Sequence, residues 1–309
     1  MKKFALAFLA LSTCFASEID PFNGRDVELA NALPVINAKA NFLMQDALDK
    51  ANEKDECSEK ALYKQLRKKF RNQYTSEFSK WVVETEQIEK VTTNTSDSIY
   101  QDFKWFQAIV PGLFAKISDP AGKVMRVNGV LIGTDKFEHF FGSGFNYFKK
   151  FYLKEKTLEK AMNIGYRAET GFLGAMMTGV MSYADMVANF NGMRFWNTML
   201  GKHVDILTLQ PVSPYVSCKE GKWQQVRELE LGAYIDDAWD EGINCSWFRT
   251  EKLVDKVKVQ MAKYARRDNI SITCPMSTEK LNIAGEKYQN LPIDIVNYQG
   301  HQPLKKLKK

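Results

Sequence analysis

The sequence has no apolar run long enough to cross a membrane as a helix, which requires about 18 to 20 mostly apolar residues. The longest charge-free run, Thr170 to Ala184, has 15 residues and includes Gly, Ser and Thr. Neither Ser143 nor Ser182 lies in the Gly-x-Ser-x-Gly turn of serine hydrolases, which disfavours that class of enzyme. We therefore expect a mature chain that is soluble or peripherally attached, with no transmembrane span.

The first 16 residues have the three parts of a secretory signal. Two lysines follow Met1, an apolar run extends from Phe4 to Leu11, and small or polar residues continue to Ala16. We expect cleavage after Ala16, because Cys14 and Ala16 then fill the small −3 and −1 positions. In a second reading, the segment ending at Cys14 is a lipobox that places a lipid on this cysteine. Both readings predict export, to the periplasm or to an outer-membrane-associated location.

Cysteine is sparse and has no metal-binding spacing. Beyond Cys14 the chain contains Cys57, Cys218, Cys245 and Cys274, without a CxxC or CxxxC pair, which argues against a thiolate zinc site. An even number of cysteines in an oxidising compartment predicts two disulfides, for which three pairings exist. We favour one bridge among the three later cysteines, with Cys57 tying the N-terminal helices to the rest.

The charge balance is only mildly basic. Removing residues 1–16 takes away Lys2 and Lys3, and leaves 41 basic against 37 acidic residues, a net charge of +4. The basic side chains are dispersed among acids, so the pattern predicts no nucleic-acid partner. A basic tail at 299–309 is expected to be a solvated end, or to contact anionic lipid or cell-wall polymer weakly.

The residue pattern predicts a mainly α fold, a multi-helix bundle with a small β-hairpin and a disulfide-bearing C-terminal region. Some 293 mature residues suffice to bury a substantial core. The expected regions are a signal peptide (1–16), an N-terminal helical region (17–122), a motif-bearing helical core with the hairpin (123–202), a Cys-containing C-terminal region (203–298) and the basic tail (299–309).

Apolar periodicity predicts the individual helices. One amphipathic helix is expected from Ser58 to Trp81, and an earlier helix from 25 to 54, bent near Pro34. A short aromatic helix is expected between Tyr100 and Pro111. The last predicted helix covers 250–267.

An Asn128-Gly129 pair between two apolar arms predicts a hairpin over 124–132, because this pair readily adopts the positive φ angles of a type I′ turn.

Two polar helical faces carry the side chains best suited to chemistry. Asp135 and His139 are four residues apart and so lie on one face of a helix. A second face, around Asp185, repeats polar residues at steps of three and four. Both faces are edged with apolar side chains, so packing them together predicts a small buried polar site. Its members are Asp135, His139, Glu169, Ser182, Asp185 and Asn189.

These stretches resemble the VanZ-like and YfiM-type families of bacterial envelope proteins over roughly residues 127–200. The resemblance is carried by Asp135-Lys136-x-x-His139-Phe140 and Ser182-x-x-Asp185-Met186-x-Ala188-Asn189-x-x-Gly192. Of the Lys-Glu-x-x-x-Asp pattern that YfiM-type proteins tend to have between them, only Glu169 is present. The resemblance implies an envelope location and polar residues inside a helical bundle, but no established reaction.

Structural roles explain the same residues without chemistry. Thr134 is a good N-cap, and Asp135 would then complement the helix dipole. Ser182 and Asp185 have the spacing of a capping box, although Glu is commoner than Asp at its last position. His139 would be a core histidine that is hydrogen-bonded to Asp185 or to a backbone carbonyl.

Two chemistries are open if the site is functional. Asp, His and Glu side chains can bind a divalent metal ion such as Zn²⁺ or Mn²⁺ and activate a water molecule. Alternatively, His139, oriented by Asp135 or Asp185, would act as a general base on a lipid-linked or cell-wall substrate. A muramidase with Glu169 as the acid is a weaker possibility, because Glu169 adjoins a Gly-rich segment rather than an obvious cleft.

A second acidic stretch covers 234–245, where four acids stand among aromatic residues. Its spacing does not match an EF-hand. We favour acids in the first turn of a helix, with Cys245 in a disulfide, over a cation or sugar site. His203 and His301 have no partners at ligand spacing and are assigned no role.

The leading expectation is an exported cell-envelope protein of structural or binding role with a polar intrahelical cluster. The alternative is a cell-wall or lipid-directed hydrolase, with or without a divalent metal ion, in which His139 acts with Glu169 or Asp185. Partners would be cell-wall or membrane-surface components.

Overall fold

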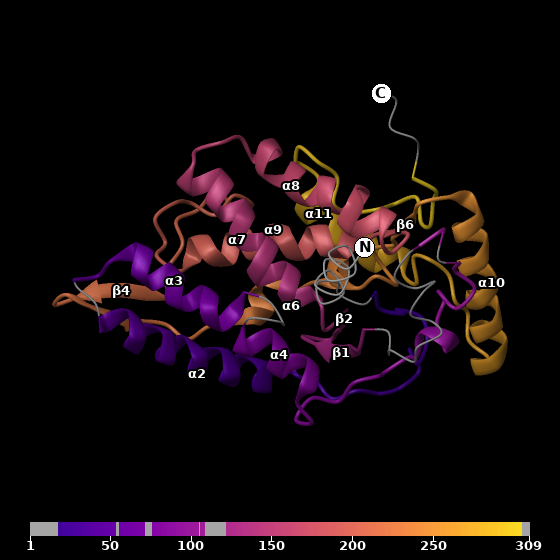
Figure 1. The fold of residues 1–309 in the computed structure, drawn as a ribbon, viewed down its shortest axis with the longest axis horizontal. Helices are drawn as coiled ribbons and strands as arrows, with labels where there is room; N and C mark the ends of the chain where they lie inside the picture. Colours follow the sequence, from indigo (N-terminus) through magenta and orange to yellow (C-terminus); the bar gives the residue numbers. More distant parts are fainter. Residues whose placement is uncertain (1–17, 54–55, 72–75, 105, 109–121, 305–309) are drawn as a thin grey trace, which may run out of the picture.

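The computed structural model describes residues 18–53, 56–71, 76–104, 106–108 and 122–304 (Figure 1). About half of the chain is helical and its strands are few and short. The predicted signal peptide, including Cys14, and residues 305–309 of the basic tail lie outside the described residues. Within the described ranges, no helix has the length and apolar character needed to cross a bilayer.

The helices and strands follow one another along the chain in short, closely spaced elements. The α-helices are α2 (Leu33–Asn52), α3 (Glu59–Phe70), α4 (Glu77–Glu84), α6 (Lys136–Glu138), α7 (Gly144–Phe148), α8 (Leu158–Thr170), α9 (Tyr183–Thr198), α10 (Glu251–Asp268) and α11 (Thr278–Tyr288). Three π-helical turns, η2 (His139–Ser143), η3 (Lys149–Leu153) and η4 (Phe172–Met176), interrupt or follow them. Three antiparallel two-stranded sheets pair β1 (Val124–Val127) with β2 (Val130–Gly133), β3 (Val180–Met181) with β6 (Trp247–Phe248), and β4 (Val216–Lys219) with β5 (Lys222–Gln225).

Helix α9 is the centre of the fold, and all of its residues are buried. Figure 1 shows it between α7, α8 and α11, with α2 and α3 beyond α7 and with α10 at the opposite end of the molecule. Its closest neighbour is α7, because Gly144 and Gly192 face each other where the helices cross. A Cβ added at Gly144 would lie 2.6 Å from Cα of Gly192, so the two backbones approach without side chains between them.

The N-terminal region is helical, as expected, but its helices differ from two predictions. Helix α2 begins at Leu33 with Pro34 in its first turn, rather than bending at this proline. Proline suits the start of a helix, where its missing N–H is not needed. The stripe predicted as one helix is divided into α3 and α4, because Ser76 is extended immediately before α4. Tyr74, in the same stripe, lies outside the described residues.

The predicted hairpin is confirmed as β1 and β2. Val127 pairs with Val130, and the turn residues Asn128 and Gly129 have φ angles of 54° and 80°. These positive angles match the type I′ geometry expected of Asn-Gly. The hairpin delivers the chain directly to Asp135.

The C-terminal region combines one confirmed helix with one that the sequence reading missed. The helix expected at 250–267 is α10, whose buried face includes Leu253, Val257 and Met261. Helix α11 was not predicted. Part of the predicted basic tail packs on the protein, since Gly300 and His301 are buried and the Leu304 N–H donates to the Phe248 carbonyl.

The aromatic segment after Ser98 forms turns rather than the expected helix over its described residues up to 104. Tyr100 and Phe103 are nevertheless buried, in a second apolar cluster with α10. Turns, rather than the expected helix, therefore place both rings in the core. Trp105 and residues 109–121 lie outside the part of the chain that the structure describes.

Two disulfides connect distant parts of the chain. Cys57 is bonded to Cys218, which ties the segment between α2 and α3 to β4. Cys245 is bonded to Cys274, so this bridge lies wholly within the C-terminal region. The Cys57–Cys218 bridge instead joins the N-terminal region to the C-terminal region.

Candidate functional site

A buried lysine lies at the centre of the polar cluster. The side chain of Lys136 has no exposed surface, and its Nζ lies 2.7 Å from Oδ2 of Asp135 and 2.6 Å from Oδ1 of Asp185. It also lies 2.5 Å from Oε1 of Glu241. Three carboxylates from three separate segments therefore share one ammonium group. We call Asp135, Lys136, His139, Asp185 and Glu241 the Lys136 cluster.

His139 joins this cluster from the next helical turn. Its Nε2 lies 3.2 Å from Oδ2 of Asp185, and its Nδ1 lies 3.3 Å from Oδ1 of Asn189. The Lys136 ammonium contacts the other oxygen of Asp185, so the Asp185 carboxylate lies between the Lys136 ammonium and the His139 ring. With 18% of its side chain exposed, His139 is the more accessible of the two ion-pair partners of Asp185, because Lys136 has no exposed side-chain surface.

The local sequence explains how these side chains meet. Ser182 caps α9, since its Oγ accepts from the backbone N–H of Asp185 at 3.2 Å, as the capping-box reading expected. The same hydroxyl donates to Oε1 of Glu241 at 3.0 Å. One serine thus fixes the start of α9 and connects it to the C-terminal segment.

The close crossing of α7 and α9 sets the distance between the two polar faces. A Cβ added at Gly192 would lie 1.8 Å from the carbonyl oxygen of Phe140, so only glycine fits there. This contact holds the turn that carries His139 against the turn that carries Asn189. The two predicted faces meet because small residues permit it.

Electrostatics make the members of the cluster unequal. Desolvation opposes ionisation of Lys136, but Asp135 and Asp185 outweigh it and raise its pKa, so it remains an ammonium. Desolvation likewise opposes ionisation of Asp185, yet His139 and Lys136 lower its pKa below the usual value. Desolvation raises the pKa of Glu241 to about 7, although Lys136 acts in the opposite direction.

Two further acids lie within electrostatic reach. Desolvation, together with the charges of Asp185 and Glu18, raises the pKa of Glu169 well above its ordinary value. Desolvation and the charges of Glu241 and Asp185 do the same for the pKa of Glu18. Burial therefore favours the protonated, uncharged form of both carboxyl groups over the carboxylate.

The structure brings all six residues of the predicted site to one region, with Glu169 as a neighbour rather than a contact of His139. Sequence reasoning missed two members of the Lys136 cluster and one neighbouring acid. Lys136 was visible only as a letter of the Asp-Lys-x-x-His motif. Glu241 had been placed in the separate acidic stretch, and Glu18 had carried no signal beyond its position after the predicted cleavage point.

The other acids of that stretch have structural partners. Asp236 caps the short 3₁₀ turn Asp237–Trp239 by accepting from the N–H of Ala238. Asp240 forms a two-point ion pair with Arg25, at 2.9 and 2.7 Å. The expectation of acids in the first turn of a helix holds only for Asp237, because Asp236 precedes the turn and Asp240 follows it. Cys245 is in a disulfide, as expected.

One subset of the cluster has the chemistry of a metal site. Asp135, His139 and Asp185 each offer a ligand atom, and these atoms lie within 4.8 Å of one another. Two carboxylates and one imidazole suit borderline divalent ions such as Zn²⁺ or Mn²⁺.

Comparisons with known proteins assign no family to the chain. No family model matches it, no curated protein matches it, and no solved structure matches it. The resemblance to VanZ-like and YfiM-type proteins therefore stays a prediction.

Proposed function

We propose that this is an exported cell-envelope protein with a binding role, and that the Lys136 cluster holds a divalent metal ion between Asp135, His139 and Asp185. The observation that carries the proposal is the convergence of these three ligand atoms within 4.8 Å.

The two aspartates have oxygens to spare on the side away from the lysine. Asp135 uses Oδ2 for Lys136, and its Oδ1 is buried without a hydrogen-bond partner among the described atoms. Asp185 uses Oδ1 for Lys136 and turns Oδ2 toward His139. A cation placed between Oδ1 of Asp135, Oδ2 of Asp185 and Nε2 of His139 leaves both contacts to Lys136 in place.

Lys136 supports such a site from behind. Its ammonium lies against both aspartates and orients them, as hydrogen-bonded partners of metal ligands commonly do. It also neutralises part of the negative charge when the ion is absent, which lets the empty site remain folded. The partly exposed His139 leaves the ion an edge that solvent or a partner's oxygen ligand reaches.

An envelope location is supported by the secretion-type N-terminal sequence and by the two disulfides. Partners are then cell-wall or membrane-surface components that supply an oxygen ligand to the ion.

Calorimetric titration of the oxidised, full-length mature protein with Mn²⁺ tests the proposal. We expect one site in the wild type and at least a tenfold weaker affinity in His139→Gln. His203→Gln is the matched control, because His203 stacks on Tyr152 far from the cluster along the chain and is exposed. Absence of a site in the wild type, or equal affinity in His139→Gln and His203→Gln, would overturn the proposal.

A metal-dependent hydrolase of cell-wall or lipid material is the second candidate. The specific observation in its favour is the buried Glu169 beside the cluster, whose pKa is raised by desolvation, since a carboxylic acid with a raised pKa can donate a proton to a leaving group. Glu169→Gln should then keep the Mn²⁺ affinity and abolish release of soluble products from peptidoglycan or lipid vesicles. An inactive wild type would eliminate this candidate and leave the binding role standing.

A further inference from the structure

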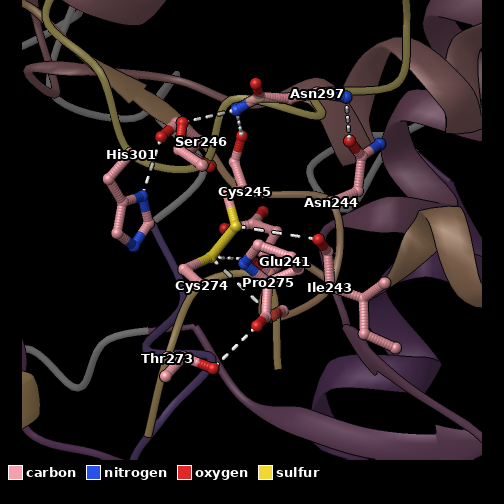
Figure 2. The surroundings of a disulfide bond; sticks show 12 residues. Glu241, Ile243, Asn244, Cys245, Ser246, Thr273, Cys274, Pro275, Asn297 and His301 are labelled. Carbon is pink, nitrogen blue, oxygen red and sulfur yellow. Dashed lines mark hydrogen bonds between the residues drawn. A yellow bond between two sulfur atoms is a disulfide. The ribbon is translucent and has the colours of Figure 1, made fainter. Parts of the chain in front are cut away.

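A second convergence of possible ligands lies around the disulfide between Cys245 and Cys274. Figure 2 shows the His301 ring beside the two sulfur atoms, with Ser246 and Asn297 nearby. One ring nitrogen of His301 and both Sγ atoms lie within 4.8 Å of one another. This group shares no side chain with the Lys136 cluster.

The His301 ring is prepared to donate a lone pair. Its Nδ1 lies 2.9 Å from the carbonyl oxygen of Ser246, which can only accept, so Nδ1 carries the proton and Nε2 carries the lone pair. Nε2 is buried and has no hydrogen-bond partner among the described atoms, and the whole residue is 7% exposed. Burial also lowers the pKa of His301 to about 4, so the ring stays neutral.

The ring is held in this orientation by its surroundings. Phe22 and Phe248 pack edge-on against it, with centroids 5.7 and 5.1 Å away. A carbonyl that fixes the tautomer of an imidazole is a common feature of metal-binding histidines. A cavity of about 360 Å³ adjoins both Cys274 and His301 and gives a small ion a way in.

From these contacts we infer that reduction of the Cys245–Cys274 disulfide creates a zinc site formed by the two thiolates and Nε2 of His301. A dithiol reductant supplies two electrons and two protons, so that the S–S bond breaks, two thiols form, and the reductant becomes a disulfide. Zn²⁺ then displaces both thiol protons and binds two sulfurs and one nitrogen. The cavity leaves its fourth position open to water.

Sequence spacing could not reveal this site, because 29 residues separate the cysteines and His301 follows later still. The fold supplies the proximity that a CxxC motif would otherwise provide. In the oxidised protein the sulfurs are bonded to each other and the site is closed, so occupancy depends on the redox state.

Cobalt substitution in the full-length protein tests the inference, since Co²⁺ bound to thiolates shows a charge-transfer absorption that carboxylate and imidazole ligands lack. We expect this band after reduction with a phosphine that is removed before cobalt is added, and no band in the oxidised protein. His301→Gln should weaken Co²⁺ and Zn²⁺ binding by roughly 100-fold or more, because even outer partners of metal-bound histidines are worth about 10- to 100-fold.

His203→Gln is the matched control and should leave the band unchanged. If His301→Gln fails to fold by circular dichroism, X-ray absorption of zinc on the reduced wild type decides, and two sulfurs with one imidazole nitrogen are expected. The inference is overturned by a missing band in the reduced protein, by equal binding in a folded His301→Gln variant, or by a zinc shell without nitrogen.

Discussion

Replacing Lys136 with methionine tests the central electrostatic feature of the fold. The side chain has no exposed surface, and its ammonium contacts three carboxylates at 2.5 to 2.7 Å. Methionine keeps most of the apolar stem but leaves those carboxylates without a counter-ion. Removing one partner of a buried ion pair costs about 3–5 kcal/mol. We expect a loss in this range in the free energy of unfolding at pH 7.

Urea unfolding measures this loss, and its pH dependence gives a second check. The pKa of Asp185 is lowered in the folded state, so its contribution to stability is present above its unfolded value of 3.8 and is lost as the pH falls through the folded pKa. The difference between Lys136→Met and the wild type should therefore shrink below about pH 4.

Lys280→Met is the control, because Lys280 pairs with Asp237 at the surface and such a pair contributes about 0–1 kcal/mol. A loss of unfolding free energy below about 1 kcal/mol for Lys136→Met at pH 7 would refute the reasoning, since the buried ammonium would then contribute no more than an exposed ion pair does.

Three further predictions concern other parts of the molecule. The pKa of Glu241 is about 7 in the folded protein and 4.5 in the unfolded chain, so its stabilising contribution is complete below pH 4.5 and is lost as the pH rises to 7. The melting temperature of the wild type should therefore fall between pH 4.5 and 7. Glu241→Gln should make this fall smaller. Gly192→Ala should lower the free energy of unfolding in urea by about 3 kcal/mol, the upper end for overpacking, because the new Cβ meets the Phe140 carbonyl. An unchanged free energy of unfolding would contradict the close crossing of α7 and α9. Replacing Cys57 and Cys218 together with serine should cost about 2–5 kcal/mol by thermal unfolding, since their bridge closes a long loop, and an unchanged melting temperature would argue against this pairing.

Local elements were predictable where the chain carries a periodic or turn-specific signal. The hairpin followed from Asn128-Gly129, and α10 followed from an apolar stripe whose residues are buried as expected. The predicted helix boundaries were wrong where the apolar stripe continued across an interruption of the helix. The apolar spacing after Ser58 gives no sign that Ser76 is extended and separates α3 from α4.

The candidate site was predictable as two faces but not as a charged centre. The spacing of Asp135 and His139 placed them on one face, and the fold then joined that face to Asp185. Lysine is almost never fully buried, so no pattern of polarity would place Lys136 in a core. Its partner Glu241 is 105 residues away in the chain, a distance over which periodicity carries no information.

Glu241 also connects the two proposed sites. Its carboxyl group contacts Lys136 and Ser182, whereas its backbone carbonyl lies 3.8 Å from Sγ of Cys274. Breaking the nearby disulfide frees Cys274 to move, and any shift of the backbone at Glu241 changes the distance between its carboxylate and the Lys136 ammonium. Because these charges have little contact with water, a small displacement alters their interaction more than it would at the surface. Glu241 is therefore the residue through which a change at the C-terminal bridge would reach the charges beneath His139, because its backbone lies beside that bridge and its side chain contacts Lys136.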